Sequence, residues 1–464
     1  MRLVLVALAG ALVVAACSSS GAPASSSDDG VGDGGVPSGP ITFHKHVEPV
    51  LQKVCQNCHV AGGIAPFALV TYDDAKAVAG SIVAQTAARV MPPWGAQDTA
   101  ECKPPMPWKN DLRLTDQEIA ILAAWHTGGN LEGDPKDAPP PRTSSPATHL
   151  SGALSLAPAT PFTLAGSNDT FKCFVLDPKL TATAYLTATN FVPTNKTIVH
   201  HALAFAIPAS AKVPGDTYDC FGGPGIDNPT LVAAWAPGGI PAEYPPDVGV
   251  SLQAGTRFVM QVHYHPHANG TKDPDATAFE YRVTPTAPSY EAVPTLIGNF
   301  ASAVGSDGRG LEPGPDDPGG TPTFMIPAGA ANHVETMHFV MPSFGPLTPI
   351  IHILGIGAHM HLAGRDEKIT ITRGGTESCL MQEPAWSFNW QRGYAYDAPI
   401  ESLPSIAPGD TLRMRCTYDN TMQNPDLAAA RSEAGMTQPT NIALGESTTD
   451  EMCLGAFTFV YKAR

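Results

Sequence analysis

The sequence predicts a multidomain chain, in which a small all-α domain precedes two all-β sandwich domains. Helical signals are confined to residues 41–135, and a stiff Pro-rich linker follows at 136–152. Residues 153–464 then carry β-branched or alternating runs, such as Thr256–Tyr264 and Thr411–Tyr418, separated by Gly and Pro turns. A chain of 464 residues is long enough for two or three domains, and we divide the β region into 153–290 and 291–464.

Residues 1–17 predict an export signal. Arg2 precedes an apolar run, Leu3–Ala16, that is too short to span a bilayer as a finished helix. The run ends at Cys17 in a pattern that resembles a bacterial lipobox, where the thiol is acylated after cleavage; an ordinary secretory signal is the alternative. We expect a periplasmic or outer-membrane lipoprotein, anchored to the membrane at Cys17, with residues 18–40 as a flexible tether.

The predicted helical domain begins with a helical stretch at residues 43–51 and closes with a helix after Thr115. Thr115 and Glu118 have the spacing of a capping box. Apolar residues at helical spacing follow, namely Ile119, Ile121, Leu122 and Trp125. The domain is expected to end near Pro135.

Between these helices, Cys55, Cys58 and His59 form a CxxCH signature. In this signature the two thiols add to the haem vinyl groups, and the histidine becomes the proximal iron ligand. A zinc or redox CxxC is the alternative, but export and the adjacent histidine favour haem c. The sequence therefore predicts a covalently attached haem c, bound through Cys55, Cys58 and His59.

The second axial ligand of the haem is expected downstream. Met91, in Met-Pro-Pro-Trp, resembles the Met-Pro loop of class I cytochromes c, so we assign it as the ligand and the domain as cytochrome c-like. Met106 lies in a near duplicate of this loop and stays an alternative, as do His44 and His46. His/Met ligation raises the haem potential, which suits an electron carrier.

Three groups of histidines stand in the β region. His359 and His361 are two residues apart, so on a strand they share one face and can bind one metal. His200 and His201 are neighbours, which would point to opposite faces of a regular strand. For both to bind one metal together, the strand must be bulged there. The third group is His263 to His265, and spacing alone leaves the metal open.

Five ordered segments resemble the ascorbate-dependent copper monooxygenases, the family of dopamine β-monooxygenase and the peptidylglycine hydroxylating enzyme. The resemblance covers about residues 155–464. Its segments are Ile198-Val199-His200-His201, Gln261-Val262-His263-Tyr264, the run from His359 to Arg365, Pro408-Gly409-Asp410 with Cys416-Thr417-Tyr418, and Asp450-Glu451-Met452-Cys453. HxH alone is a weak signal, but five segments in the family's order are specific.

The resemblance implies two jelly-roll-like β-sandwiches that each hold one copper ion. The electron-storing copper site would be formed by His200, His201 and His263, and the catalytic, oxygen-activating site by His359, His361 and Met452. Imidazole and thioether are ligands that suit copper, and a thioether favours Cu(I). The resemblance also implies the disulfides Cys416–Cys453 and Cys173–Cys220, while six cysteines as such allow fifteen pairings.

The remaining histidines of the β region have no place in these ligand sets. We take His265, His267, His333, His338 and His352 as structural or as hydrogen-bond partners of ligands, with His265 in place of His263 left open.

The substrate residues depart from the peptide-hydroxylating branch. Where that branch has an Arg, an Asn and a Tyr, this chain has Gly357, Leu454 and Ala456, which argues against a peptide substrate. We expect hydroxylation of a C–H bond of a small organic substrate with O₂. The chain's own haem, ascorbate or a periplasmic donor would supply the electrons.

The main alternative is a copper-binding, electron-transfer lipoprotein without oxygenation, and a sandwich adhesin ranks last. The net charge of −16 argues against nucleic acid as a partner.

Overall fold

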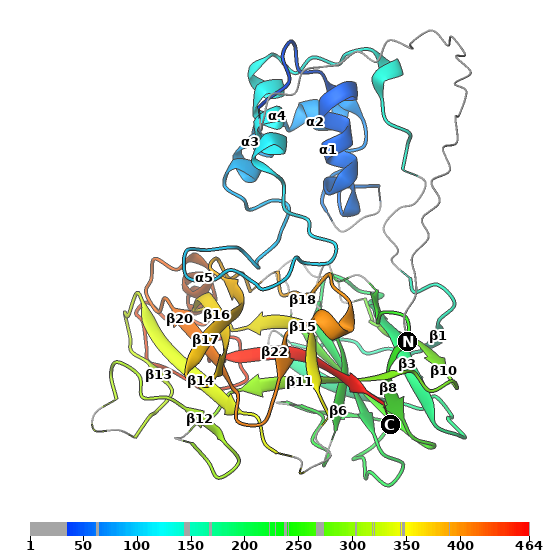
Figure 1. Ribbon diagram of the computed structural model, residues 1–464, viewed down its shortest axis with the longest axis vertical. Helices are drawn as coiled ribbons and strands as arrows, with labels where there is room; N and C mark the ends of the chain where they lie inside the picture. The colour runs from blue at the N-terminus through cyan, green and yellow to red at the C-terminus, as the bar shows by residue number, and fades with distance from the viewer. Residues whose placement is uncertain are drawn as a thin grey trace, which may run out of the picture.

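The computed structural model describes residues 35–463, apart from short segments at 62–64, 143–148, 167–168, 222, 228, 236–238, 240, 266–272, 302–303, 318, 320, 344, 346–348 and 389. Predictions for the export signal, for Cys17, for most of the tether and for His267 lie outside these residues. A layer of helices stands above two β-sandwiches (Figure 1). No helix in the described part is long and apolar enough to cross a membrane.

The helical unit has its own hydrophobic core. Its elements are η1 (Phe43–Val47), α1 (Glu48–Lys53), η2 (Cys55–Asn57), α2 (Tyr72–Ala77), α3 (Ala79–Ala87), α4 (Asp116–Thr127) and η3 (Pro135–Asp137). The predicted capping box at the start of α4 is confirmed: the Glu118 amide donates to the Thr115 hydroxyl, and the Thr115 amide donates to the Glu118 carboxylate. Leu122 and Trp125 of α4 are buried against Phe43 and Leu51.

The first sandwich is built from two antiparallel layers. One layer contains β1 (Leu154–Leu156), β10 (Ala278–Thr284), β3 (Ala184–Val192), β7 (Ala242–Glu243) and β8 (Val248–Leu252). The other has the order β5 (Thr217–Asp219), β2 (Thr170–Leu176), β9 (Arg257–Tyr264), β4 (Val199–Ile207) and β6 (Thr230–Trp235). Phe174, Phe258 and Phe279 are completely buried between the layers.

The second sandwich repeats this arrangement. One layer holds β11 (Tyr290–Gly298), β22 (Leu454–Lys462), β15 (Ile351–His359), β18 (Gly393–Ala395) and β19 (Ser405–Ile406). The other has the order β12 (Arg309–Leu311), β14 (His333–Val340), β20 (Thr411–Tyr418), β16 (Gly364–Arg373) and β17 (Thr376–Glu383). Smaller elements complete it: β13 (Met325–Ile326) paired with β21 (Ile442–Ala443), η4 (Ile400–Ser402) and α5 (Pro425–Glu433).

The two sandwiches share one sheet. Strand β8 of the first pairs in parallel with β11 of the second, through Val248 opposite Tyr290 and Gly249 opposite Glu291. This joint makes a ten-stranded sheet that runs through both sandwiches. The sequence predicted two sandwiches and gave no sign of this continuity.

Local sequence patterns located the strands well. The run predicted at Thr411–Tyr418 is β20 without change, and the run at Thr256–Tyr264 is β9 from Arg257 onward. The predicted bulge is confirmed too, because the register of β4 against β9 shifts between Val199 and His201.

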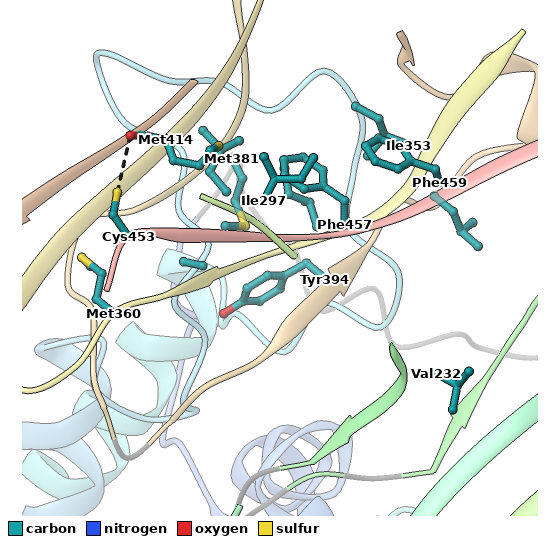
Figure 2. Packing of buried hydrophobic residues seen from close by; sticks show 14 of the residues in the cluster. Val232, Ile297, Ile353, Met360, Met381, Tyr394, Met414, Cys453, Phe457 and Phe459 are labelled. Atoms are coloured by element: carbon teal, nitrogen blue, oxygen red, sulfur yellow. Dashed lines mark hydrogen bonds between the residues drawn. The ribbon is translucent and has the colours of Figure 1, made fainter. Parts of the chain in front are cut away.

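The core of the second sandwich packs against its last strand, β22. Phe457 and Phe459 of β22 stack with ring centroids 5.4 Å apart, close to Ile353 of β15 (Figure 2). At the start of this strand Cys453 forms the disulfide with Cys416, and Cys173 forms one with Cys220. Both pairings implied by the family resemblance are therefore confirmed.

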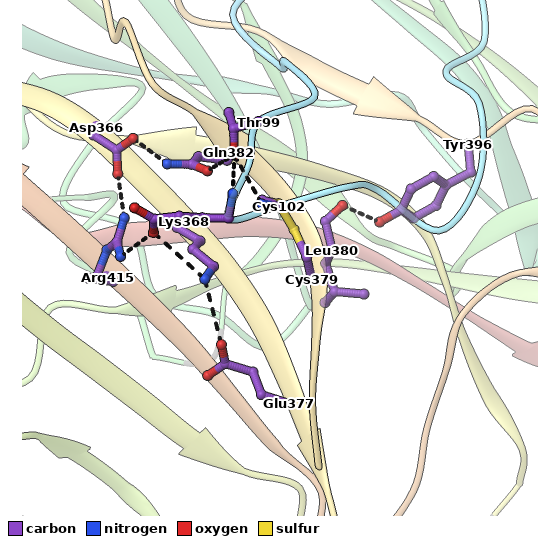
Figure 3. The surroundings of a disulfide bond; sticks show 11 residues. Thr99, Cys102, Asp366, Lys368, Glu377, Cys379, Leu380, Gln382, Tyr396 and Arg415 are labelled. Carbon is purple, nitrogen blue, oxygen red and sulfur yellow. Dashed lines mark hydrogen bonds and ion pairs between the residues drawn. A yellow bond between two sulfur atoms is a disulfide. The ribbon is translucent and has the colours of Figure 1, made fainter.

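A third disulfide joins the helical unit to the second sandwich. The crossing segment, residues 88–115 between α3 and α4, leaves the helices and descends onto β17 and β18 (Figure 1). There Cys102 bonds Cys379 of β17, and the Thr99 hydroxyl bonds the Gln382 side chain at 2.7 Å (Figure 3). Trp108 stacks on Tyr396 with ring centroids 4.8 Å apart. Part of the predicted haem domain, 41–135, thus packs as part of the sandwich.

Candidate metal centres

Three histidines of the first sandwich converge on one point. Nδ1 of His201 lies 3.2 Å from Nδ1 of His200 and 3.4 Å from Nδ1 of His263. Ligand nitrogens about 2.0–2.1 Å from a tetrahedral metal such as zinc lie roughly 3.3 Å from one another. This set of three nitrogen donors therefore fits a metal ion, and one candidate ligand atom from each residue lies within 4.8 Å of the others.

The bulge in β4 is what makes this convergence possible. The shift between Val199 and His201 turns both neighbouring imidazoles to one side, and His201 stands opposite His263 of β9. Phe171 of β2 stacks on the His263 ring with centroids 4.2 Å apart, which fixes that ring.

Asp169 lies beside the histidine set and contacts both His263 and His265. Its carboxylate lies 2.6 Å from Nδ1 of His265 and 3.4 Å from Nε2 of His263. Burial raises the Asp169 pKa, but hydrogen bonds from the two imidazoles outweigh burial and hold that pKa well below its usual range. His265 therefore pairs with Asp169, whereas His263 lies against His200 and His201.

The imidazoles of His200 and His201 are neutral at physiological pH. Burial, with the charges of His263 and His265, lowers the pKa of His200 to about 3. Burial is also the main cause that lowers the pKa of His201 well below its usual value. Because a metal binds the neutral imidazole, these residues need no proton loss before binding.

A second pair of histidines lies at the end of β15. The rings of His359 and His361 stand at 88° with centroids 5.4 Å apart. Nδ1 of His359 bonds the Gln391 side-chain oxygen at 2.8 Å, and Nδ1 of His361 bonds the Asp450 carbonyl at 3.2 Å. Since both Nδ1 atoms are engaged, Nε2 of each ring is the atom left for a metal.

Glu451 organises the backbone around this pair. Its carboxylate accepts the amides of His361 at 2.8 Å, Ala363 at 2.6 Å and Met452 at 3.2 Å. Burial raises the Glu451 pKa to about 8, against the opposing effect of these amides. The Tyr418 hydroxyl donates to the Met452 carbonyl at 2.7 Å, so Met452 is held on the same scaffold as His361.

Phe388 connects the two histidine sets. Its ring stacks on His200 with centroids 4.8 Å apart and meets His361 edge-on with centroids 6.1 Å apart. The charges of His359 and His361 also contribute to lowering the His201 pKa. The two candidate centres are therefore near neighbours, with one aromatic ring in contact with both.

The CxxCH residues lie at the end of α1 in the helical unit. Cys55 and Cys58 are free thiols. Nδ1 of His59 bonds the Phe67 carbonyl oxygen at 3.1 Å, which leaves Nε2 for a metal. This donor set fits a covalently attached haem, with Cys55 and Cys58 as the attachment points and His59 as the iron ligand.

The four candidates for the other axial position have different surroundings. Met91 follows α3 and lies beside Leu114 and Ile119 of the helical unit. Met106 packs against the core of the sandwiches instead. His44 pairs with Glu48 at 2.8 Å, and Nδ1 of His46 accepts the Thr42 amide.

The histidines left outside the ligand sets have structural partners. They are His333 with Glu335 at 2.8 Å, His338 with Glu312 at 3.5 Å, and His352 with the Leu403 carbonyl at 3.1 Å.

Sequence reasoning missed four residues of these sites, namely Asp169, Phe388, Gln391 and Glu451. Only Glu451 left a signal, through its place beside Met452 in a family segment.

The chain belongs to the copper type II ascorbate-dependent monooxygenase family. The family's N-terminal domain matches residues 158–271, and its C-terminal domain matches residues 324–463.

Among curated proteins, the putative DBH-like monooxygenase protein 2 of Homo sapiens is 26% identical over 58% of this chain and 48% of its own length. DBH-like monooxygenase protein 1 of Gallus gallus is 30% identical over 48% of this chain and 32% of its own. The peptidyl-glycine alpha-amidating monooxygenase A of Xenopus laevis is 28% identical over 56% of this chain and 23% of its own length. The chain thus spans half or less of the length of these relatives.

Proposed function

We propose that the chain is an exported copper-dependent monooxygenase that hydroxylates a C–H bond of a small organic substrate with O₂. The observation that carries this proposal is a set of three converging histidines beside a second histidine pair, in which Nε2 of each ring is left for a metal. His200, His201 and His263 would hold one copper ion, and His359, His361 and Met452 the other. When bound, copper supplies one-electron and O₂ chemistry.

The protein's own residues prepare both sites. Asp169 orients His263, while Gln391 and the Asp450 carbonyl orient His359 and His361. Phe388 also holds the two sets together, since its ring stacks on His200 and meets His361 edge-on.

The packing around Gly357 supports a small substrate rather than a peptide. A Cβ atom at Gly357 would lie 3.0 Å from the Arg392 carbonyl and 3.4 Å from the Gly393 Cα of the neighbouring strand. These contacts are tight, so a Cβ in this place requires a small shift of the β18 backbone. The close pairing of β15 with β18 thus favours glycine where the peptide-hydroxylating branch has its arginine.

The haem unit would deliver electrons to the copper sites. Hydroxylation with O₂ consumes two electrons per turnover, and a c-type haem held by Cys55, Cys58 and His59, with Met91 as the second ligand, is a one-electron carrier. Ascorbate or a periplasmic donor would reduce the haem or the coppers directly. The covalent link through Cys102 and Cys379 keeps such a donor beside its acceptor.

Export and a lipid anchor at Cys17 complete the proposal. Three disulfides in the described residues support an oxidising compartment. Mass spectrometry of the purified chain tests it, since an acylated N-terminal Cys17 is expected and an unmodified full-length N-terminus would contradict it.

Metal analysis and turnover test the enzyme proposal. We expect two copper ions and one haem per chain, and substrate-dependent O₂ uptake with a reductant. His59→Ala should abolish the haem band and reduce the rate with haem-dependent donors, while His126→Ala, an exposed histidine of α4, is the matched control. An unchanged rate with every reductant in the His59 variant would refute the relay.

A second function is favoured by Leu454 and Ala456, which replace substrate-binding residues of the peptide branch. It is a copper-holding, electron-transfer lipoprotein without oxygenation. Full copper occupancy without substrate-dependent O₂ uptake across a broad set of C–H compounds would establish this function instead.

A further inference from the structure

The loop between β17 and β18 is attached to the second histidine set at two points. The buried Trp386 indole donates to the His361 carbonyl at 3.1 Å. The Gln391 side-chain oxygen accepts a hydrogen bond from Nδ1 of His359 at 2.8 Å. The position of this loop is therefore tied to the ring of His359 and to the backbone of His361.

Phe388 of the same loop reaches the first histidine set. Its ring stacks on His200 with an interplanar angle of 21°, and the centroids are 4.8 Å apart. Inside the loop, the Gln391 side-chain amide donates to the Phe388 carbonyl at 3.1 Å. Gln391 thus binds His359 with its oxygen and the backbone of Phe388 with its nitrogen. A continuous series of contacts runs from His200 through Phe388 and Gln391 to His359.

This series of contacts makes the two sets depend on each other. Once a ring nitrogen of His200 binds copper, the plane of that ring is fixed, and Phe388 stacks on a fixed face. The Phe388 carbonyl then holds the Gln391 amide, whose oxygen keeps His359 in the tautomer that leaves Nε2 for a metal. The dependence also runs from the second set to the first, because coupling between two binding equilibria is reciprocal.

We propose that Phe388 and Gln391 are positioning residues that couple copper binding at the two sets, so that occupancy of either set raises the affinity of the other. This inference rests on the proposed function, since both sets must bind copper. Aromatic ring pairs contribute free energies equivalent to about a 2- to 12-fold change in an equilibrium constant. We therefore expect a coupling factor of that order, equal for both sets.

The test is a titration of the full-length protein with Cu(I) against a competing chelator. His201→Ala combined with His263→Ala disables the first set but leaves the His200 ring that Phe388 contacts. This change should lower the copper affinity of the second set by the coupling factor. In a Phe388→Leu background the same change should have no effect on the second set, because the sets then bind copper independently.

Gln391→Glu separates the orientation of His359 from the coupling. A glutamate keeps an oxygen that accepts from His359, but it has no N–H to donate to the Phe388 carbonyl. The second set should still bind copper, and its affinity should no longer depend on the first set. Thr448→Val is the matched control, because Thr448 contacts Asp169 of the first sandwich at 3.5 Å without belonging to the loop. It should leave the coupling factor unchanged.

Copper stoichiometry distinguishes the failure of this inference from that of the proposed function. A wild-type chain that binds fewer than two copper ions overturns both. Two ions that bind independently in wild type overturn this inference alone, as does a coupling factor that is lost in Thr448→Val and retained in Phe388→Leu. Circular dichroism checks the fold of each variant, and if Phe388→Leu is misfolded, the coupling factor of Gln391→Glu decides.

Discussion

Glu383 makes the stability of the docked domains depend on pH. This residue of β17 stands opposite Glu367 of β16 and is 2% exposed. The Tyr394 hydroxyl, which hydrogen-bonds Glu383, accepts the Gly95 amide of the crossing segment at 2.9 Å. Burial raises the Glu383 pKa from 4.5 to about 8, against the Tyr394 hydrogen bond and the charge of Arg392. The folded chain therefore binds this proton more tightly than the unfolded chain does.

The sign of the effect follows from this difference. Below pH 4.5 Glu383 is protonated in both states, so its full contribution to stability is present. As the pH rises to about 8, the unfolded chain loses the proton and the folded chain retains it, so the free energy of unfolding decreases. At 1.36 kcal/mol for each pKa unit, the loss is at most about 5 kcal/mol.

Glu383→Gln keeps the shape of the side chain and removes its titration. We expect the difference in unfolding free energy between wild type and variant to change by several kcal/mol between pH 5 and pH 8, in favour of the variant at high pH. Urea unfolding monitored by tryptophan fluorescence at four pH values measures this change in the unfolding free energy. Glu101→Gln, at an exposed carboxylate of the same interface that pairs with Arg415, is the control. Parallel pH profiles for wild type and Glu383→Gln would refute the reasoning.

Three further changes probe the sites and the docking. Glu451→Ala leaves three backbone amides without their acceptor, which costs about 1–3 kcal/mol of stability for each amide. Because these amides hold the backbone around His361 and Met452, metal analysis should show one copper lost and one retained. Replacing Cys102 and Cys379 by Ser removes the disulfide that closes a loop of 277 residues, and so lowers the free energy of unfolding by at most about 5–6 kcal/mol. Proteolysis between residues 94 and 108 should therefore become faster. Phe388→Ala should slow substrate oxidation while copper content, measured by mass spectrometry, stays at two.

The sequence predicted what depends on short-range pattern. The alternation of apolar and polar side chains predicted both ends of β20. The adjacent His200 and His201 implied a bulge, which the register of β4 confirms. The capping box of α4 involves two residues three apart, so it too is visible in the sequence. In each case the deciding interaction joins residues that are close along the chain.

The docking of the helical unit could not be predicted in this way. Cys102 and Cys379 are 277 residues apart, and neither lies in a recognisable motif. Phe388 acts through the positions of two rings that belong to different sandwiches, His200 and His361. Such contacts depend on how whole domains pack, and the alternation of side chains carries no information on that packing.

The parallel pair of β8 and β11 also determines how this protein can be divided. If the sandwiches are separated at this joint, each fragment exposes a strand edge whose backbone N–H and C=O groups can pair with another chain. Val248 and Val250 of β8 are buried in the intact protein and would stand at that edge. Either half expressed alone is therefore expected to self-associate more than a fragment that contains both sandwiches.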